Sequence, residues 1–129
     1  MIVVDTNIIS YLLLQGERSD AMERLLKTDG NWVAPRLWLD EFLNVLATYE
    51  RNGKLPTDQV SQILDDALEL MHGASYEVPP ERVLAVARRT GCSAYDSQYI
   101  ALAEDLGAML YTCDQRILRQ CAGLAIEPK

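Results

Sequence analysis

The chain of 129 residues has only one histidine, His72, and three cysteines. A single histidine excludes a histidine-rich metal centre and argues against a Ser-His-Asp or Cys-His catalytic triad. The odd number and the spacing of Cys92, Cys113 and Cys121 fit neither a disulfide framework nor a Cys-x-x-Cys zinc site. We therefore expect free thiols in a reducing compartment.

Long apolar runs are also missing from the sequence. No segment approaches the roughly 18 consecutive apolar residues that a membrane-spanning helix needs. The chain begins directly with the apolar residues 2–4, without the basic stretch and cleavage site of a signal peptide. We therefore expect a cytoplasmic protein that does not contact a membrane.

Basic residues are scarce, with 12 lysines and arginines against 19 acids and a formal net charge of −7. This balance argues against a broad basic surface for nucleic acid, so a polyanionic ligand would need another source of positive charge. The composition is otherwise ordinary, at 49% hydrophobic and 24% charged residues. Such a composition and length predict one globular domain over residues 1–129.

Short apolar runs alternate with longer segments of helical periodicity along the chain. We expect strands at residues 1–4, 32–34, 75–78, 109–111 and 124–126. Helices are expected after residue 5 up to Gly16, and at residues 19–27, 35–52, 57–71, 81–89, 94–106 and 115–120. This alternation predicts the α/β class, as a three-layer α/β/α sandwich with a short, mainly parallel central sheet.

The expected helix starts carry typical signals. Thr6 and Asn7 are predicted to cap the helix after the first strand, and Thr57 to cap a later one. Pro35 is predicted to open the long helix 35–52. In parallel sheets ligands bind beyond the carboxyl ends of the strands, where the strand order reverses, so acids at those ends matter most.

Three aspartates at such places each have an ordinary explanation. Asp5 ends the first strand and could form a turn or cap a helix. Asp96 follows Ser93 by three residues, as in a capping box, and Asp114 follows a strand as a helix cap would. Taken singly, none of them indicates an active site.

Glu41 is harder to explain, because it lies in the apolar stripe of its helix between Leu37 and Val45. A buried carboxylate is costly unless it is paired with an arginine or bound to a metal, and the sequence leaves both alternatives open. If Glu41 meets the three aspartates at one cleft, their repulsion requires cations or protons. Oxygen ligands favour the hard ions Mg²⁺ and Mn²⁺, which activate water and clamp a phosphodiester.

Other phosphate chemistries fit the sequence less well. Gly53-Lys54 lacks the rest of a Walker loop, and no Gly-x-Gly-x-x-Gly follows a strand. A haloacid-dehalogenase-like phosphatase would carry a second aspartate where this chain has Asn7. A phosphoacceptor receiver domain would need paired acids after the first strand and a lysine near the last strands, whereas the only lysines are Lys27, Lys54 and the terminal Lys129.

The sequence resembles the PIN-domain family of metal-dependent ribonucleases, and in particular the short VapC-type toxins. The resemblance covers nearly the whole chain. It rests on Ile2-Val3-Val4-Asp5-Thr6-Asn7, on Ala34-Pro35 with Glu41-x-x-Asn44-x-Leu46, on Tyr95-Asp96-Ser97-x-Tyr99-x-Ala101-Leu102-Ala103, and on Leu110-x-Thr112-x-Asp114.

The resemblance implies that four acids bind Mg²⁺ or Mn²⁺ and carry catalysis, namely Asp5, Glu41, Asp96 and Asp114. It also implies a set of polar side chains that support them: Thr6, Asn7, Asn44, Ser93 and Thr112. The implied activity is endoribonucleolytic, leaving 5′-phosphate and 3′-hydroxyl ends.

The resemblance further implies a toxin of a type II toxin–antitoxin pair. Its partners would be RNA as substrate, a cognate antitoxin protein, DNA only indirectly through the antitoxin, and a second copy in a homodimer. The alternative is a housekeeping PIN-domain nuclease that processes RNA without an antitoxin.

Overall fold

Five short strands form one parallel sheet at the centre of the protein, in a computed structural model that describes residues 1–129. The strand order is β3-β2-β1-β4-β5, and every neighbouring pair is parallel. The strands are β1 (Ile2–Val4), β2 (Trp32–Pro35), β3 (Ser75–Tyr76), β4 (Leu110–Tyr111) and β5 (Ala125–Ile126). The sequence predicted all five, with bounds that differ from the structure by no more than two residues.

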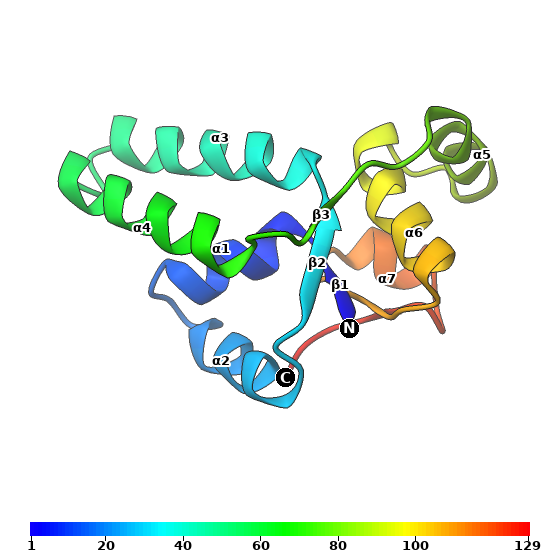
Figure 1. Cartoon of the computed structure of the whole chain (residues 1–129), viewed down its shortest axis with the longest axis horizontal. Helices are drawn as coiled ribbons and strands as arrows, with labels where there is room; N and C mark the ends of the chain where they lie inside the picture. The colour runs from blue at the N-terminus through cyan, green and yellow to red at the C-terminus, as the bar shows by residue number, and fades with distance from the viewer.

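Seven helices cover the two faces of this sheet (Figure 1). On one side lie α1 (Thr6–Leu13), α2 (Ser19–Thr28), α3 (Leu37–Arg51) and α4 (Thr57–Leu70). On the other side lie α5 (Pro80–Thr90), α6 (Ala94–Leu106) and α7 (Gln115–Gln120). The predicted three-layer α/β/α architecture is therefore confirmed.

The central strand and α6 form the middle of the core. Val3 and Val4 of β1 have no exposed surface, as expected for a strand covered on both faces. Helix α6 packs against β1, β2 and β4, and its residues Tyr99–Ala103 are all buried. This packing fixes the position of α6, whose first turn carries Asp96.

None of the helices combines the length and the apolarity that crossing a membrane requires.

The capping residues of two helices differ from the sequence prediction, although both helices begin where they were expected. Asp5 is the N-cap of α1, because its side chain accepts a hydrogen bond from the Ile8 backbone N–H, and Thr6 is already helical. The prediction that Thr6 and Asn7 cap this helix was therefore wrong, whereas the explanation of Asp5 as a helix cap is confirmed. Thr57 likewise lies inside α4, with Pro56 in the extended conformation before it.

Helix α3 starts later than predicted because Pro35 belongs to β2. The backbone N–H groups of Ala34 and Arg36 donate to the Ala74 and Tyr76 carbonyls, so pairing with β3 needs no donor from residue 35. A proline is tolerated there because it removes no bond of the sheet.

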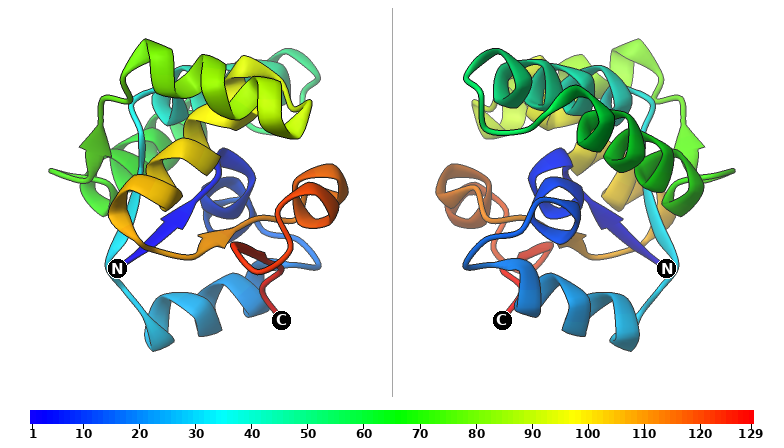
Figure 2. Two further views of the ribbon diagram at one scale, coloured as in Figure 1. Left: turned by 90° about the vertical axis from the view of Figure 1, so that its right-hand side faces the viewer. Right: turned by 90° about the vertical axis from the view of Figure 1, so that its left-hand side faces the viewer.

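The order of the strands defines one edge at which a ligand site is expected. From β1 the chain proceeds to β2 and β3 on one side, and then crosses to β4 and β5 on the other (Figure 2). All carboxyl ends meet at one edge, and the topological switch lies between β1 and β4. Asp5 directly follows β1, and Asp114 follows β4 by three residues. The switch point therefore lies between two of the predicted acids.

Candidate active site

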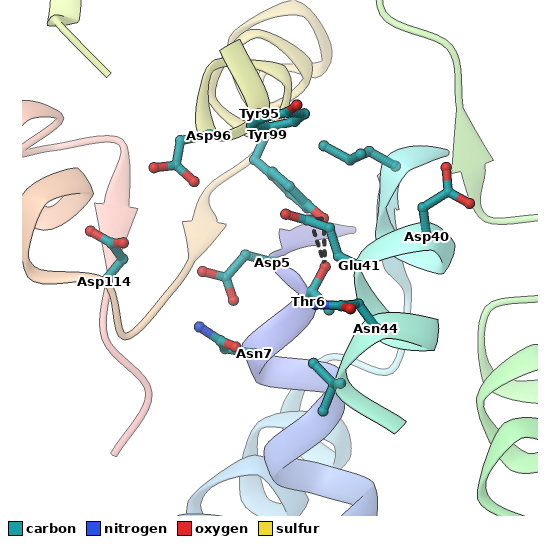
Figure 3. Close-up of a pocket in the computed structure, with 12 residues that line it drawn as sticks. Asp5, Thr6, Asn7, Asp40, Glu41, Asn44, Tyr95, Asp96, Tyr99 and Asp114 are labelled. Carbon is teal, nitrogen blue, oxygen red and sulfur yellow. Dashed lines mark hydrogen bonds between the residues drawn. The ribbon is translucent and has the colours of Figure 1, made fainter. Parts of the chain in front are cut away.

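A cavity of about 440 Å³ opens at this edge, and all four predicted acids line it (Figure 3). Each comes from a different part of the fold: the end of β1, α3, the first turn of α6, and the start of α7. The chain separates Asp5 from Asp114 by most of its length, and the parallel sheet brings them together. The cavity is lined by Asp5, Thr6, Asn7, Leu37, Asp40, Glu41, Asn44, Val45, Tyr95, Asp96, Tyr99 and Asp114.

Asp5 is the buried acid of the cavity, with 7% of its surface exposed. One oxygen accepts the bond from the Ile8 N–H at 3.2 Å, and the other accepts a bond from the Thr112 hydroxyl. Burial raises the pKa of Asp5 to about 6, the two hydrogen bonds oppose this, and the charges of Asp114 and Asp96 add to it. The ionisation of Asp5 is therefore coupled to the charges of Asp114 and Asp96.

Thr112 connects two of the acids from behind the cavity. Its hydroxyl oxygen donates to Asp5 and accepts a 3.0 Å hydrogen bond from the Asp114 backbone N–H. Thr112 has no exposed surface, so this link is closed to water. It holds the ends of β1 and β4 in register at the cavity.

Glu41 is held by two hydroxyl groups and has no arginine partner. Thr6 Oγ1 donates to Glu41 Oε1 at 2.9 Å, and the Tyr99 hydroxyl donates to the same oxygen at 2.6 Å. The two hydroxyl oxygens lie 2.7 Å apart. The alternative of a salt bridge between Glu41 and an arginine is therefore wrong.

Asp96 and Asp114 lie at helix starts, as their capping signals predicted. Ser93 Oγ accepts a 3.0 Å bond from the Asp96 N–H and caps α6. Asp114 Oδ1 caps α7 by accepting from the Arg116 and Ile117 N–H groups. Desolvation raises the pKa of Asp96, and the charges of Asp114 and Glu41 raise it further. A capping role and a place in the cavity thus occur together.

The predicted supporting residues divide into two groups. Asn7 and Asn44 line the cavity directly, as does Thr6. Ser93 and Thr112 lie outside the lining and act through the hydrogen bonds described above. That any of these residues takes part in catalysis or metal binding stays a prediction.

Five lining residues were not among the predicted site residues, namely Leu37, Asp40, Val45, Tyr95 and Tyr99. Tyr99 could have been found, because it lies three residues after Asp96 and therefore on the same face of α6. The direction of the Tyr95 side chain depends on how α6 rotates against the sheet, and no local signal gives that rotation.

The cavity has an excess of negative charge that the protein does not neutralise. None of the four acids forms an ion pair, and the salt bridges lie elsewhere, for example between Arg82 and Asp105. Carboxylate oxygens with neither histidine nor cysteine suit a hard divalent cation. No three of these side chains are already arranged as one ligand group, so the fit to a metal rests on their chemistry and shared cavity.

The comparisons with known proteins agree with this fold. The PIN domain family model matches residues 2–123, and the chain belongs to the PIN-domain family. Ribonuclease VapC3 from Pyrobaculum aerophilum is 30% identical over 126 residues, which cover 95% of this chain and 96% of that relative. The resemblance to PIN-domain ribonucleases of the VapC type is therefore confirmed.

Solved structures show the same fold over the whole chain. The structure of PAE2754 from Pyrobaculum aerophilum has a TM-score of 0.77 and 27% identity, covering 98% of this chain and 89% of that one. FitAcB from Neisseria gonorrhoeae has a TM-score of 0.72 and 17% identity, covering 98% and 96%. A toxin–antitoxin complex from Klebsiella pneumoniae has a TM-score of 0.66 and 17% identity, covering 100% and 98%. The last two support the fold alone.

Proposed function

We propose that residues 1–129 form one nuclease domain, a metal-dependent endoribonuclease that acts as the toxin of a type II toxin–antitoxin pair. The observation that carries the proposal is the gathering of four carboxylates around one cavity at the topological switch point. The similarity to Ribonuclease VapC3 supports RNA as the substrate.

Mg²⁺ or Mn²⁺ would be held by Asp5, Glu41, Asp96 and Asp114, directly or through water. Such an ion supplies positive charge for the phosphodiester oxygens and makes a nearby water molecule more acidic. It would also supply the positive charge that a chain with a net charge of −7 lacks for binding RNA.

The side chains of the cavity have separate tasks in this proposal. Thr6 and Tyr99 fix one oxygen of Glu41, and Thr112 fixes one oxygen of Asp5, so that these carboxylates keep their orientation. Asp96 lines the cavity and is less buried than Asp5, so it is the carboxylate that we assign as proton acceptor for the attacking water. Water oxygen bonds to phosphorus, the bond from phosphorus to the 3′-oxygen breaks, and that oxygen takes up a proton.

Cleavage of RNA in the presence of Mg²⁺ or Mn²⁺ tests this function. We expect the wild type to cleave, and Asp5→Asn and Asp96→Asn to lose at least about a hundredfold in rate. Asp65→Asn, which removes an exposed acid of α4, is the matched control and should cleave normally. Undiminished cleavage by Asp5→Asn and Asp96→Asn would remove both residues from the mechanism.

The proposed partners are a cognate antitoxin, DNA through that antitoxin, and a second copy of the chain. This chain shares its fold with a protein of the Klebsiella pneumoniae toxin–antitoxin complex, which makes an antitoxin the partner to test first. RNA and an antitoxin would both meet the protein in the cytoplasm.

Co-expression with the adjacent reading frame should yield a stable complex and restore growth, and light scattering should give a dimer. Failure of the first test would favour a housekeeping nuclease.

A further inference from the structure

The cavity has a second wall that differs from the carboxylate side. Leu37, Asn44 and Val45 lie on one face of α3 and line the cavity together with Tyr95 of α6. In Figure 3, Asp96 and Asp114 lie on one side, and Asn44 lies on the opposite side with Tyr95 above. The α3 side of the cavity thus combines apolar and amide groups with the carboxylates of Asp40 and Glu41.

The Tyr95 side chain is largely uncovered by the rest of the protein. Its side chain is 62% exposed, the highest fraction among the large hydrophobic residues of the chain. No aromatic ring or cation packs against it, since the only aromatic pair joins Trp38 and Phe42 and the two cation–π contacts involve other tyrosines. The exposed part of the Tyr95 ring is therefore available to a ligand.

We infer that Tyr95 and the α3 residues Leu37, Asn44 and Val45 bind an unpaired base of the RNA next to the cleaved bond. This inference rests on the proposed ribonuclease function. Tyr95 lines the same cavity as Asp96 and the other carboxylates, so a phosphodiester bound at the carboxylates can place a neighbouring base against the tyrosine ring. A base is planar and uncharged, so it stacks on an aromatic side chain and is not repelled by the acids.

The same geometry limits the class of RNA that the site accepts. A base in a duplex is stacked and paired, and can reach Tyr95 only after it has left the helix. A base bound at Tyr95 must therefore be unpaired when the bond is cleaved. Asn44 and Asp40, both exposed on α3 and lining the cavity, present amide and carboxylate groups that could bond to the edge of the stacked base.

Steady-state cleavage of an unstructured RNA by Tyr95→Ala and Tyr95→Phe tests the inference. Loss of one stacked base lowers affinity by about tenfold to a hundredfold. We expect Tyr95→Ala to raise KM by this factor with little change in kcat, and Tyr95→Phe to behave as the wild type. Tyr76→Ala removes another exposed tyrosine that does not line the cavity, and should leave KM unchanged.

A substrate with one abasic nucleotide beside the cleaved bond gives an independent measurement. It should raise KM for the wild type and have no further effect on Tyr95→Ala, because both changes remove the same contact. If Tyr95→Ala has the KM of the wild type, or if Tyr95→Phe raises KM as much as Tyr95→Ala does, the inference about Tyr95 is wrong. The proposed ribonuclease function would not be affected by either result. If Tyr95→Ala instead weakens only the complex with the antitoxin, the exposed ring serves a protein partner and the inference is also wrong. Failure of the wild type to cleave any RNA would contradict the proposed function itself.

Discussion

The Tyr99 hydroxyl donates a 2.6 Å hydrogen bond to Glu41 Oε1 and thereby joins α6 to α3 at the cavity. Tyr99 is only 2% exposed, and burial together with the Glu41 charge raises the pKa of its hydroxyl. The hydroxyl therefore stays protonated and acts as a donor. Through this bond, the helix that carries Asp96 fixes the carboxylate of the helix that carries Glu41.

Replacing Tyr99 with phenylalanine should weaken both folding and cleavage. A hydrogen bond to a charged group contributes about 1.5–3 kcal/mol, so Tyr99→Phe should lower the free energy of unfolding by roughly this amount. Cleavage should fall at least about tenfold, because one of the two donors that orient Glu41 is lost. Urea denaturation and RNA cleavage measure the two effects. Tyr95→Phe, which removes a hydroxyl from an exposed residue of the same helix, is the control and should change neither the free energy of unfolding nor the cleavage rate. If Tyr99→Phe cleaves RNA as fast as the wild type, Glu41 does not need the Tyr99 hydrogen bond for cleavage.

The buried Asp5 predicts a specific dependence of stability on pH. Its pKa of about 6 in the folded protein exceeds the usual value of 3.8, so the folded state binds this proton more tightly than the unfolded chain. The stability contribution of Asp5 should therefore be full below the lower value and decrease as the pH rises through about 6, by about 3 kcal/mol in total.

Asp5→Asn provides the reference for this effect because it cannot titrate. In EDTA, the difference in unfolding free energy between wild type and variant should shift in favour of the variant as the pH rises through this window. Denaturation with urea at a series of pH values measures the difference, and the acids that lie away from the cavity cancel in it. A wild type that gains stability over the variant as the pH rises would mean that Asp5 is better stabilised in its ionised form.

Asp114 has two roles that substitution can separate. Asp114→Asn keeps an oxygen that can cap α7 but removes the charge from the cavity, whereas Asp114→Ala removes both. We expect the alanine variant to lose about 0.5–2 kcal/mol of stability and the asparagine variant much less. Both variants should lose cleavage activity to a similar degree. Normal cleavage by Asp114→Asn would limit this residue to capping.

The sequence was sufficient for the element types, because periodicity and turn residues are local signals. The bounds of α6 and α7 agree with the prediction, since Ser93 and Asp114 cap them as their sequence positions indicate. The start of α3 was misplaced because Pro35 is usual both at a helix start and at a strand position that needs no donor. Only the pairing with β3 decides between these two.

The site divides in the same way between local and tertiary information. The four acids were predicted to share one cleft from their places at strand ends and helix starts, and the structure brings them to one cavity. The partners of Glu41 could not be derived, because Thr6 and Tyr99 reach it across 35 and 58 residues of sequence. The burial of Glu41 predicted either an arginine or a metal ion as its partner. The structure instead shows a pair of hydroxyl groups, from Thr6 and Tyr99.

The most direct test of the account is a calorimetric titration of the metal-free protein with Mn²⁺. The account predicts saturable binding by the wild type and by Asp65→Asn, and at least about a tenfold lower affinity for Asp5→Asn and for Asp96→Asn. Equal Mn²⁺ affinity in all four proteins, or no uptake by the wild type, would contradict the claim that these distant acids form one divalent-cation site.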